Sequence, residues 1–173
     1  FKQKTAYEIY QCDWSSDVCS SDLSEWGPRA LGNRSILFDP RNEKGKDIIN
    51  GIKKREWFRP FAGTIMLEHV HDYFEMLSLK ESPYMSFAVK AKRKAVKEVP
   101  SIIHVDGTCR IQTVTREQNK HFYELIEEFY NRTGTPILFN TSFNLAGEPL
   151  VETLSDAIDT VNRSEIDYLY VPK

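Results

Sequence analysis

A helix pattern that runs directly into a buried strand pattern constrains the fold of this chain most. Apolar side chains recur with helical spacing through residues 118–132, at Phe122, Leu125, Ile126 and Phe129, and Gly134 follows as a stop signal. The next apolar run contains Ile137, Leu138 and Phe139. A helix with one apolar face is stable when that face is buried against another element. We therefore predict that helix 118–132 packs on a sheet whose central strand contains residues 136–139.

The chain from residue 24 onward alternates in the same way. Helical patterns occupy residues 42–55, 68–76 and 155–161, the last with Ser155 as its cap, and strand patterns occupy 36–38, 61–67, 85–89, 110–115 and 167–171. The basic stretch 90–97 is interpreted as a solvated strand end or a loop. No internal repeat is found, and the alternation predicts one α/β or mixed α+β domain over residues 24–173.

Residues 1–23 do not share this organisation. They have no periodic apolar face, and residues 13–23 read Asp-Trp-Ser-Ser-Asp-Val-Cys-Ser-Ser-Asp-Leu, which resembles a translated sequencing adapter. We interpret residues 1–23 as an artefactual or disordered arm, with a natural flexible arm as the alternative. Outside the arm, basic and acidic residues are equal in number, and Cys109 is the one remaining cysteine, so no disulfide can form there.

Composition excludes several classes of protein. A chain of 173 residues suits one domain, and no apolar run reaches the roughly 18 residues of a membrane span, so a soluble protein is expected. The formal net charge of -2 disfavours a globally basic nucleic-acid binder. The cysteines Cys12, Cys19 and Cys109 form neither a disulfide framework nor a zinc set, and a cytoplasmic location is expected.

Two polar segments in the first half of the domain carry cations. Gly27-Pro28-Arg29-Ala30-Leu31-Gly32-Asn33-Arg34-Ser35 brackets two arginines with glycines, so backbone N–H groups and guanidinium groups could both bind an anion. The segment Lys53-Lys54-Arg55-Glu56-Trp57-Phe58-Arg59-Pro60-Phe61 places four cations beside aromatic rings. The alternatives are a structural turn for the first and a solvated helix face for the second, but Arg59 among apolar neighbours indicates partial burial and an anionic partner.

Two further polar segments lie in the second half. The first, His104 to Thr113, contains His104 and Asp106 without a third ligand at a familiar spacing, so no metal site is predicted. Cys109 has no base beside it and is interpreted as a small buried residue. The second segment, Asn140-Thr141-Ser142-Phe143-Asn144 with Gly147-Glu148-Pro149, follows a buried strand, where open α/β sheets bind ligands. A polar turn is its alternative.

Together, the four segments resemble the C-terminal domain of the NodU/CmcH-type O-carbamoyltransferases, from about Glu25 to the end of the chain. The resemblance implies a YrdC-like fold, an open twisted mixed sheet with flanking helices. It implies that carbamoyl phosphate and ATP, with Mg²⁺, form carbamoyl adenylate, whose carbamoyl group passes to an acceptor hydroxyl. The acceptor and an iron ion would bind a larger actin-like N-terminal domain, which this sequence lacks.

The resemblance also implies site residues. Lys53, Arg59 and Arg110 would be catalytic, and the same three with Arg29, Asn140 and Ser142 would bind substrate. Lys53 and Arg59 are expected on phosphate, Arg110 on phosphate or the carbamoyl oxygen, and Asn140 with Ser142 at the carbamoyl or phosphate end. A neutral domain that binds polyanions must gather cations locally, and such cations stabilise the charge that develops on phosphate oxygens.

Two other interpretations remain open at this point. The chain could be a non-catalytic anion- or RNA-binding module of the same fold, although nucleic acid is not the partner we expect. It could also be an inactive fragment, because its carbamoyl acceptor would bind a domain that is absent. Turnover of ATP separates both interpretations from the carbamoyltransferase.

Overall fold

A computed structural model describes residues 3–4, 17–20 and 25–172 of the chain. These residues form nine strands in one mixed sheet, in the order β1-β9-β2-β3-β8-β4-β7-β6-β5. The strands are β1 (Gln3–Lys4), β2 (Asp17–Ser20), β3 (Arg34–Phe38), β4 (Ala62–Met66), β5 (Phe74–Glu75), β6 (Ala88–Ala91), β7 (Thr108–Val114), β8 (Ile137–Ser142) and β9 (Tyr168–Tyr170).

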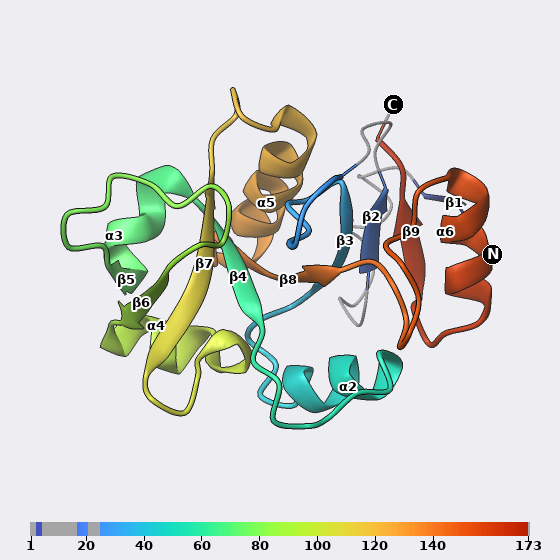
Figure 1. The fold of residues 1–173 in the computed structure, drawn as a ribbon. Helices are drawn as coiled ribbons and strands as arrows, with labels where there is room; N and C mark the ends of the chain where they lie inside the picture. The colour runs from blue at the N-terminus through green and yellow to red at the C-terminus, as the bar shows by residue number, and fades with distance from the viewer. Residues whose placement is uncertain (1–2, 5–16, 21–24, 173) are drawn as a thin grey trace.

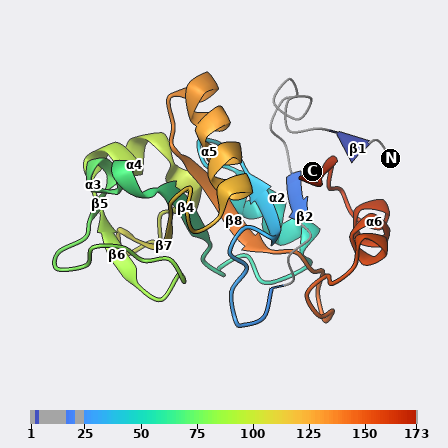
Figure 2. The same cartoon turned by 90° about the horizontal axis from the view of Figure 1, so that it is seen from above.

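Helices flank this sheet. They are α2 (Gly45–Ile52), η1 (Leu67–His69), α3 (Val70–Tyr73), α4 (Arg93–Glu98), η2 (Pro100–Ile102), α5 (Lys120–Thr133) and α6 (Leu154–Asn162). Helices α3 and α4 gather at one end of the sheet and α6 at the other, while α5 and α2 lie on opposite sides of β8 in the view of Figure 1 (Figures 1 and 2). No described helix has both the length and the apolar character that a bilayer crossing requires.

The middle of the sheet combines both pairing directions. Strand β8 runs antiparallel to β3 on one side and to β4 on the other, and β4 runs parallel to β7. The prediction of a central strand is confirmed, because Ile137, Leu138 and Phe139 are fully buried in β8. The predicted mixed α/β single domain is also confirmed, since strands of both directions share one sheet with helices on both faces.

Helix α5 covers one face of the sheet as its sequence predicts. Asn119 caps its first turn by accepting a hydrogen bond from the N–H of Phe122, and Gly134 ends it with a φ of 74°. Its buried side chains form one apolar cluster with Leu37, Met66 and Leu138 of the sheet. The opposite face of the sheet packs against α2, α3, α4 and α6 in a second and larger cluster.

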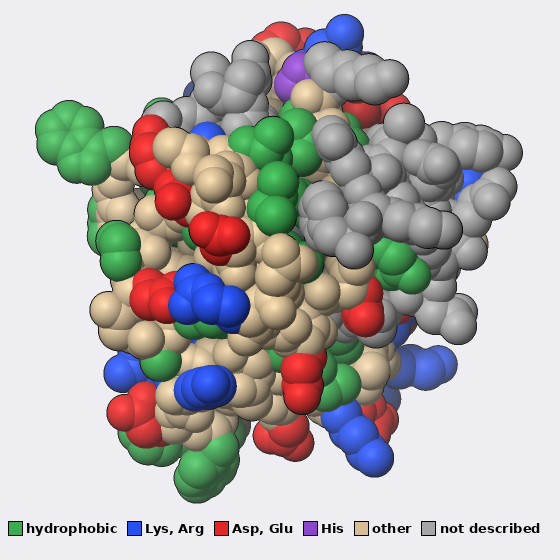
Figure 3. Space-filling view, turned by 90° about the vertical axis from the view of Figure 1, so that its right-hand side faces the viewer, with side chains coloured by type: hydrophobic (Ala, Val, Ile, Leu, Met, Phe, Trp, Pro, Cys, Tyr) green, Lys and Arg blue, Asp and Glu red, His purple; other side chains and the backbone are tan. Residues whose placement is uncertain are grey.

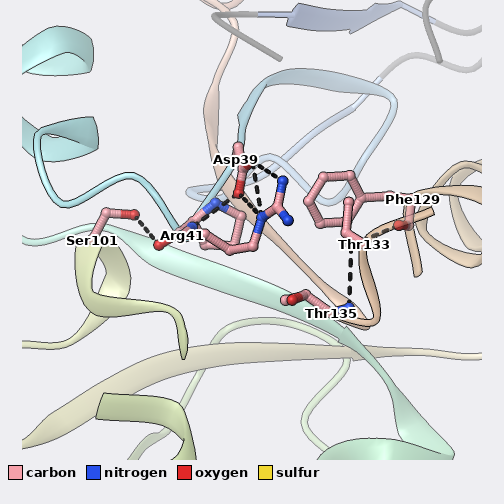
Figure 4. Close-up of polar contacts among 7 residues, drawn as sticks. Asp39, Arg41, Ser101, Phe129, Thr133 and Thr135 are labelled. Atoms are coloured by element: carbon pink, nitrogen blue, oxygen red, sulfur yellow. Dashed lines mark hydrogen bonds and ion pairs between the residues drawn. The ribbon is translucent and has the colours of Figure 1, made fainter. Parts of the chain in front are cut away.

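A turn after β3 ties three elements together (Figure 4). The Arg41 Nε lies 2.9 and 3.0 Å from the two carboxylate oxygens of Asp39, and the Arg41 guanidinium carbon lies 5.5 Å from the ring centre of Phe129. The Ser101 hydroxyl donates to the backbone oxygen of Pro40. The turn therefore links β3 to α5 and to η2.

Several predicted boundaries were wrong. The stretch 90–97 begins as a strand end, as one of its two interpretations predicted, because β6 extends to Ala91, but its remainder is helical because Arg93 begins α4. Residues 68–76 divide among η1, α3 and β5. The cap of α6 is Thr153 and not Ser155, since Thr153 and Asp156 exchange side-chain and backbone hydrogen bonds in a capping box.

The interpretation of residues 1–23 falls mostly outside the described residues. Within that stretch, β2 pairs antiparallel with β3 and parallel with β9, and β1 pairs parallel with β9. These six residues therefore pair with other strands of the sheet in the structure, and the interpretation of residues 1–23 as an arm stays a prediction. Their proposed origin as an artefact stays a prediction.

Candidate functional site

A cavity of about 580 Å³ opens where α2 ends. Its walls come from residues 53–56 and Arg59, from Ser142 at the end of β8, and from residues 144–147. Four of these wall residues are cations, Lys53, Lys54, Arg55 and Arg59, and one is the carboxylate Glu56. The cavity is therefore strongly cationic in a chain whose formal net charge is -2.

Lys53 is the most deeply placed of these cations. Its side chain is buried, and its Nζ lies 2.6 Å from the backbone oxygen of Ser142, 3.1 Å from the Ser142 Oγ and 2.9 Å from the Asn144 Oδ1. All three partners are neutral. Burial, together with repulsion from Arg55, lowers the pKa of Lys53 to about 7.

A left-handed turn directly after Lys53 shapes the next part of the wall. Lys54 has a φ of 46°, a conformation that costs a non-glycine residue roughly 1 kcal/mol or more. The turn brings the Arg55 guanidinium to 4.1 Å from the centre of the Phe61 ring, and the Arg55 Nε donates to the Asn50 Oδ1 at 2.8 Å. Arg55 is thus held from two sides by neutral groups.

Arg55 lies close both to Arg59 in the cavity wall and to Arg110 on the sheet. Burial lowers the pKa of Arg55 to about 10, and repulsion from Arg59 and Arg110 contributes. The Nη2 of Arg55 is buried without a hydrogen-bond partner among the described residues. Arg59 is about half exposed, and its Nε lies 2.7 Å from the Glu56 carboxylate, so it can swing between that partner and a ligand.

Arg110 and Asn140 stand on the same face of the sheet. Both are in register with Ala62, Arg110 from β7 and Asn140 from β8, and directly opposite residues of paired strands point to the same side. Burial and repulsion from Arg29 lower the pKa of Arg110, whose Nε is buried with no partner in the described part of the chain. Arg110 therefore presents an unsatisfied cationic donor.

Asn140 presents an unsatisfied acceptor. Its Nδ2 donates to the Gln112 Oε1 at 3.2 Å, to the Ala30 backbone oxygen at 3.3 Å and to the Thr64 Oγ1 at 3.0 Å. Two of these partners can only accept, so the amide nitrogen must face them. The Asn140 Oδ1 then points the other way and is buried without a partner among the described residues.

The Gly-Pro-Arg loop lies across Asn140 and brings Arg29 close to Arg110. One oxygen of Glu25 accepts hydrogen bonds from the N–H groups of Leu31 and Asn33, which fixes the loop. Gly32 has a φ of 113°, and a Cβ there would lie 2.1 Å from the Phe122 ring. Arg29 is exposed, and its Nη1 donates to the backbone oxygen of Pro28.

The structure brings the six sequence-predicted residues together only in part. Lys53, Arg59 and Ser142 line the cavity. Asn140 and Arg110 lie outside its lining, on the sheet face, and Arg29 lies near Arg110. Residues 140–142 were predicted to follow the buried strand and are instead the last part of β8, so the strand itself positions Asn140 and Ser142.

Other polar residues are used differently from the sequence interpretation. Arg55 was not predicted individually, although it lies in the basic run after α2. Gln112 belongs to the segment 104–113 that carried the resemblance but was given no role, and Thr64 was not predicted. Arg34 donates to the backbone oxygens of Asn33 and Glu152 and so holds backbone in place.

The structure also shows the surroundings of His104 and Cys109, for which the sequence predicted no metal site and no catalytic role. The ring nitrogens of His104 lie 3.1 Å from the Thr108 Oγ1 and from the Phe61 backbone oxygen. Among the described residues no group of three His, Cys, Asp or Glu could hold a metal ion. Cys109 is fully enclosed, and burial raises the pKa of its thiol to about 12. That thiol is too basic and too enclosed to serve as a nucleophile.

Charge is distributed differently on other parts of the molecule. On the face near α6, basic and acidic side chains of the described residues are interspersed (Figure 3). In the basic stretch at α4, the Lys92 Nζ donates to the backbone oxygen of His71 and the Lys94 Nζ lies 4.4 Å from the centre of the Tyr73 ring. These lysines contribute to packing against α3.

Comparison with known proteins establishes the family. Residues 18–173 match the family model described as carbamoyltransferase C-terminus. The chain belongs to this family. Nodulation protein NolNO of Sinorhizobium fredii (strain NBRC 101917 / NGR234) is 48% identical over 150 residues, which cover 86% of this chain and 22% of that protein. Nodulation protein NolO of Bradyrhizobium diazoefficiens is 47% identical over 150 residues, which cover 86% of this chain and 27% of that protein.

This member of the carbamoyltransferase C-terminus family thus spans less than a third of the length of the curated relatives it matches. A crystal structure of full-length HypF in the phosphate- and nucleotide-bound form is similar, with a TM-score of 0.58 and 18% identity over 80% of this chain and 21% of that chain. Identity at this level shows the fold alone, and it confirms the YrdC-like fold that the sequence resemblance implied.

Proposed function

We propose that this domain binds carbamoyl phosphate and ATP and forms carbamoyl adenylate for transfer to an acceptor hydroxyl. Water cleaves carbamoyl phosphate to carbamate and phosphate, and a carbamate oxygen then bonds to the α-phosphorus of ATP as pyrophosphate leaves. The acceptor oxygen finally bonds to the carbamoyl carbon, its proton is lost, and AMP leaves. Membership of a carbamoyltransferase family supports the proposal. Lys53, Arg59 and Arg110 are the proposed catalytic residues, and Arg29, Asn140 and Ser142 complete substrate binding. Arg55 is added because it lines the cavity and is close enough to Arg110 for their charges to repel each other. The acceptor would bind a further domain, which also would hold the iron of such enzymes.

One observation supports the proposal most. Two buried donors and one buried acceptor have no hydrogen-bond partner among the described residues. Arg110 Nε and Arg55 Nη2 are buried donors without partners in the described chain, and Asn140 Oδ1 is a buried acceptor without one. Leaving such groups unsatisfied costs about 1–3 kcal/mol each. Carbamoyl phosphate offers phosphate and carbonyl oxygens to the donors and an NH₂ group to the acceptor, so its chemistry matches both kinds of group.

The same geometry suits adenylate formation. Negative charge develops on phosphate oxygens during phosphoryl transfer, and cations fixed in advance stabilise it without reorganisation. Lys53 is held by three acceptors and Arg55 by Asn50 and Phe61, so neither must be immobilised during the reaction. Mg²⁺ would accompany ATP and bind its phosphates.

The experiment compares carbamoyl phosphate with acetyl phosphate, which has a methyl group in place of NH₂. Titration calorimetry on the whole chain should give about ten-fold tighter binding of carbamoyl phosphate, because only its NH₂ can donate to Asn140 Oδ1. Equal affinities for the two ligands would contradict the role of Asn140. The variant Arg110→Ala should lower the affinity for both ligands, and Lys94→Ala on α4 should leave both affinities unchanged.

A second measurement addresses turnover. Pyrophosphate release from ATP in the presence of carbamoyl phosphate should be detectable and should be lost in Lys53→Met. Binding without pyrophosphate release would instead identify an anion-binding module or an inactive fragment. Salt-sensitive binding of RNA without any response to carbamoyl phosphate would identify a nucleic-acid module.

A further inference from the structure

Gln112 is a buried amide of β7 that has no role in the proposed function. It is 4% exposed and lies outside the walls of the cationic cavity. It follows Arg110 by two residues in the strand, so the two side chains lie on the same face of the sheet. A polar side chain buried this deeply is costly unless its atoms are hydrogen-bonded, so its partners indicate what it does.

Both ends of the Gln112 amide are hydrogen-bonded. Its Nε2 donates to the backbone oxygen of Leu31 at 3.0 Å, and its Oε1 accepts from the Thr64 Oγ1 at 2.8 Å and from the Asn140 Nδ2 at 3.2 Å. A backbone carbonyl can only accept. The Leu31 oxygen therefore requires the nitrogen of Gln112 on its side. A reversed Gln112 amide would bring two oxygens together at Leu31 and two nitrogens together at Asn140.

The direction that is set at Gln112 also fixes the amide of Asn140. The Gln112 Oε1 and the Ala30 backbone oxygen can only accept, and they lie 3.2 and 3.3 Å from the Asn140 Nδ2. The amide nitrogen must face them, and the Asn140 Oδ1 faces away. That oxygen is buried without a partner in the part of the chain that the structure describes. The hydrogen bonds from the Leu31 carbonyl through Gln112 thus end in an acceptor at Asn140.

The backbone at the start of these hydrogen bonds is itself held in place. One oxygen of Glu25 accepts from the N–H of Leu31 at 2.7 Å and from the N–H of Asn33 at 2.9 Å. Leu31 is therefore bound at its N–H by a carboxylate and at its C=O by Gln112. Rotation of either group would break these bonds, so the fold sets the orientation of the Asn140 amide before any ligand binds.

We propose that Gln112 is a positioning residue that determines the selectivity of the site for a ligand with an NH₂ group. It keeps the Asn140 oxygen free to accept, so a carbamoyl group gains a hydrogen bond that an acetyl group, with a methyl in the same place, cannot form. Gln112 acts through Asn140 and does not touch the ligand. The identity of the ligand rests on the proposed function, whereas the orientation of Asn140 can be measured in the ligand-free chain.

Selectivity is measured as the ratio of the dissociation constants of acetyl phosphate and carbamoyl phosphate, by titration calorimetry on the whole chain. Gln112→Met retains a long unbranched side chain and removes both hydrogen-bonding groups. The ratio should fall from about ten in the parent chain to about one, because carbamoyl phosphate alone binds more weakly. A purely structural loss would weaken both ligands and leave the ratio unchanged.

Thr64→Val is the matched control. It removes a buried hydroxyl that contacts both amides, but it keeps the hydrogen bonds from Leu31 through Gln112 to Asn140. Its ratio should therefore stay at about ten. An unchanged ratio in Gln112→Met, or an equal fall in Thr64→Val, would overturn the proposal. A further loss of carbamoyl phosphate affinity alone when Gln112→Met is added to Asn140→Ala would also contradict it, because Gln112 would then act without Asn140.

Hydrogen exchange of the Asn140 side-chain NH₂, followed by nuclear magnetic resonance in the ligand-free chain, separates this inference from the proposed function. Exchange should be at least about ten-fold faster in Gln112→Met than in the parent chain, and equal rates would overturn the positioning role. If exchange is faster but neither phosphate ligand binds the parent chain, the positioning role stands and the proposed function fails.

The parent chain provides a further measurement that does not depend on the folding of Gln112→Met. Nuclear Overhauser contacts between the Asn140 NH₂ hydrogens and the side chain of Thr64 should be present, because the Asn140 Nδ2 lies 3.0 Å from the Thr64 Oγ1. Their absence would show that the Asn140 amide is turned the other way and would overturn the proposal.

Discussion

The ammonium Nζ of Lys53 lies 3.1 Å from the hydroxyl Oγ of Ser142, although 89 residues separate the two in the sequence. This contact joins the end of α2 to the end of β8, and Asn144 reinforces it from the loop beyond. Each partner of the ammonium is neutral. An incoming anion would therefore meet a cation that no carboxylate has already neutralised at this contact.

Anion binding should depend on the protonation of Lys53. Its pKa is lowered to about 7 by burial, and an anion binds the charged ammonium better than the neutral amine. The affinity for sulfate, whose charge is constant over this range, should therefore fall about ten-fold between pH 6 and pH 8. Calorimetric titrations at several pH values measure this.

The variant Lys53→Arg is the matched control, because arginine keeps its charge throughout this range. Its sulfate affinity should be independent of pH. Lys53→Met should bind sulfate weakly at every pH. A parent chain with the same flat profile as Lys53→Arg would show that Lys53 does not titrate with the anion.

Arg59 should contribute directly to binding. Arg59→Ala removes a charge-assisted hydrogen bond of roughly 1.5–3 kcal/mol and should weaken carbamoyl phosphate about ten-fold or more. Glu56→Gln should have the opposite effect, since it releases Arg59 from a 2.7 Å ion pair. Thermal-shift titrations compare both with Lys94→Ala, and an identical response in all three variants would refute the assignment.

The packing of α5 on the sheet can be tested at Phe129. This side chain is fully buried, and Phe129→Ala should reduce the free energy of unfolding by about 3–5 kcal/mol. Phe58 is 67% exposed, so Phe58→Ala should change it by less than about 0.5 kcal/mol. Urea denaturation measures the free energy of unfolding of both variants. Similar losses in the two would mean that burial does not determine how much stability a phenylalanine contributes.

Gly63 should tolerate no side chain without a compensating change. A Cβ at this position would lie 2.4 Å from the Cδ1 of Ile102, so Gly63→Ala should destabilise the fold by about 1–3 kcal/mol. Ile102→Val removes that Cδ1 atom. The double variant should therefore lose less stability than the sum of the single ones, and strict additivity in urea denaturation would contradict the contact.

Local patterns predicted the parts of the fold that depend on local sequence. The periodicity of α5, with Gly134 after it, and the apolar run of β8 each lie within one short segment. The short helix α4 was missed because its four charged residues concealed a single buried position, Ala95. The capping box of α6 also lay in the sequence, and Ser155 was the wrong choice between two hydroxyl residues.

The site was predictable as a set of residue types but not as an arrangement. The basic run 53–59 is visible in the sequence, and all four of its cations line the cavity. That Arg110 and Asn140 flank Ala62 follows from the strand order β7-β4-β8, which no local pattern contains. The position of Arg55 depends on the left-handed backbone of Lys54, which the sequence does not signal.

Because the thiol of Cys109 is fully buried, the rate at which it reacts can be used to measure opening of the fold. An alkylating reagent can reach this sulfur only when β7 has opened, so the labelling rate measures how often that strand opens. With Cys12→Ser and Cys19→Ser in place, Cys109 is the single thiol of the chain. Any ligand held by the neighbouring Arg110 would slow the alkylation in proportion to its occupancy. A sulfur atom that never contacts the ligand would then report how tightly it is bound.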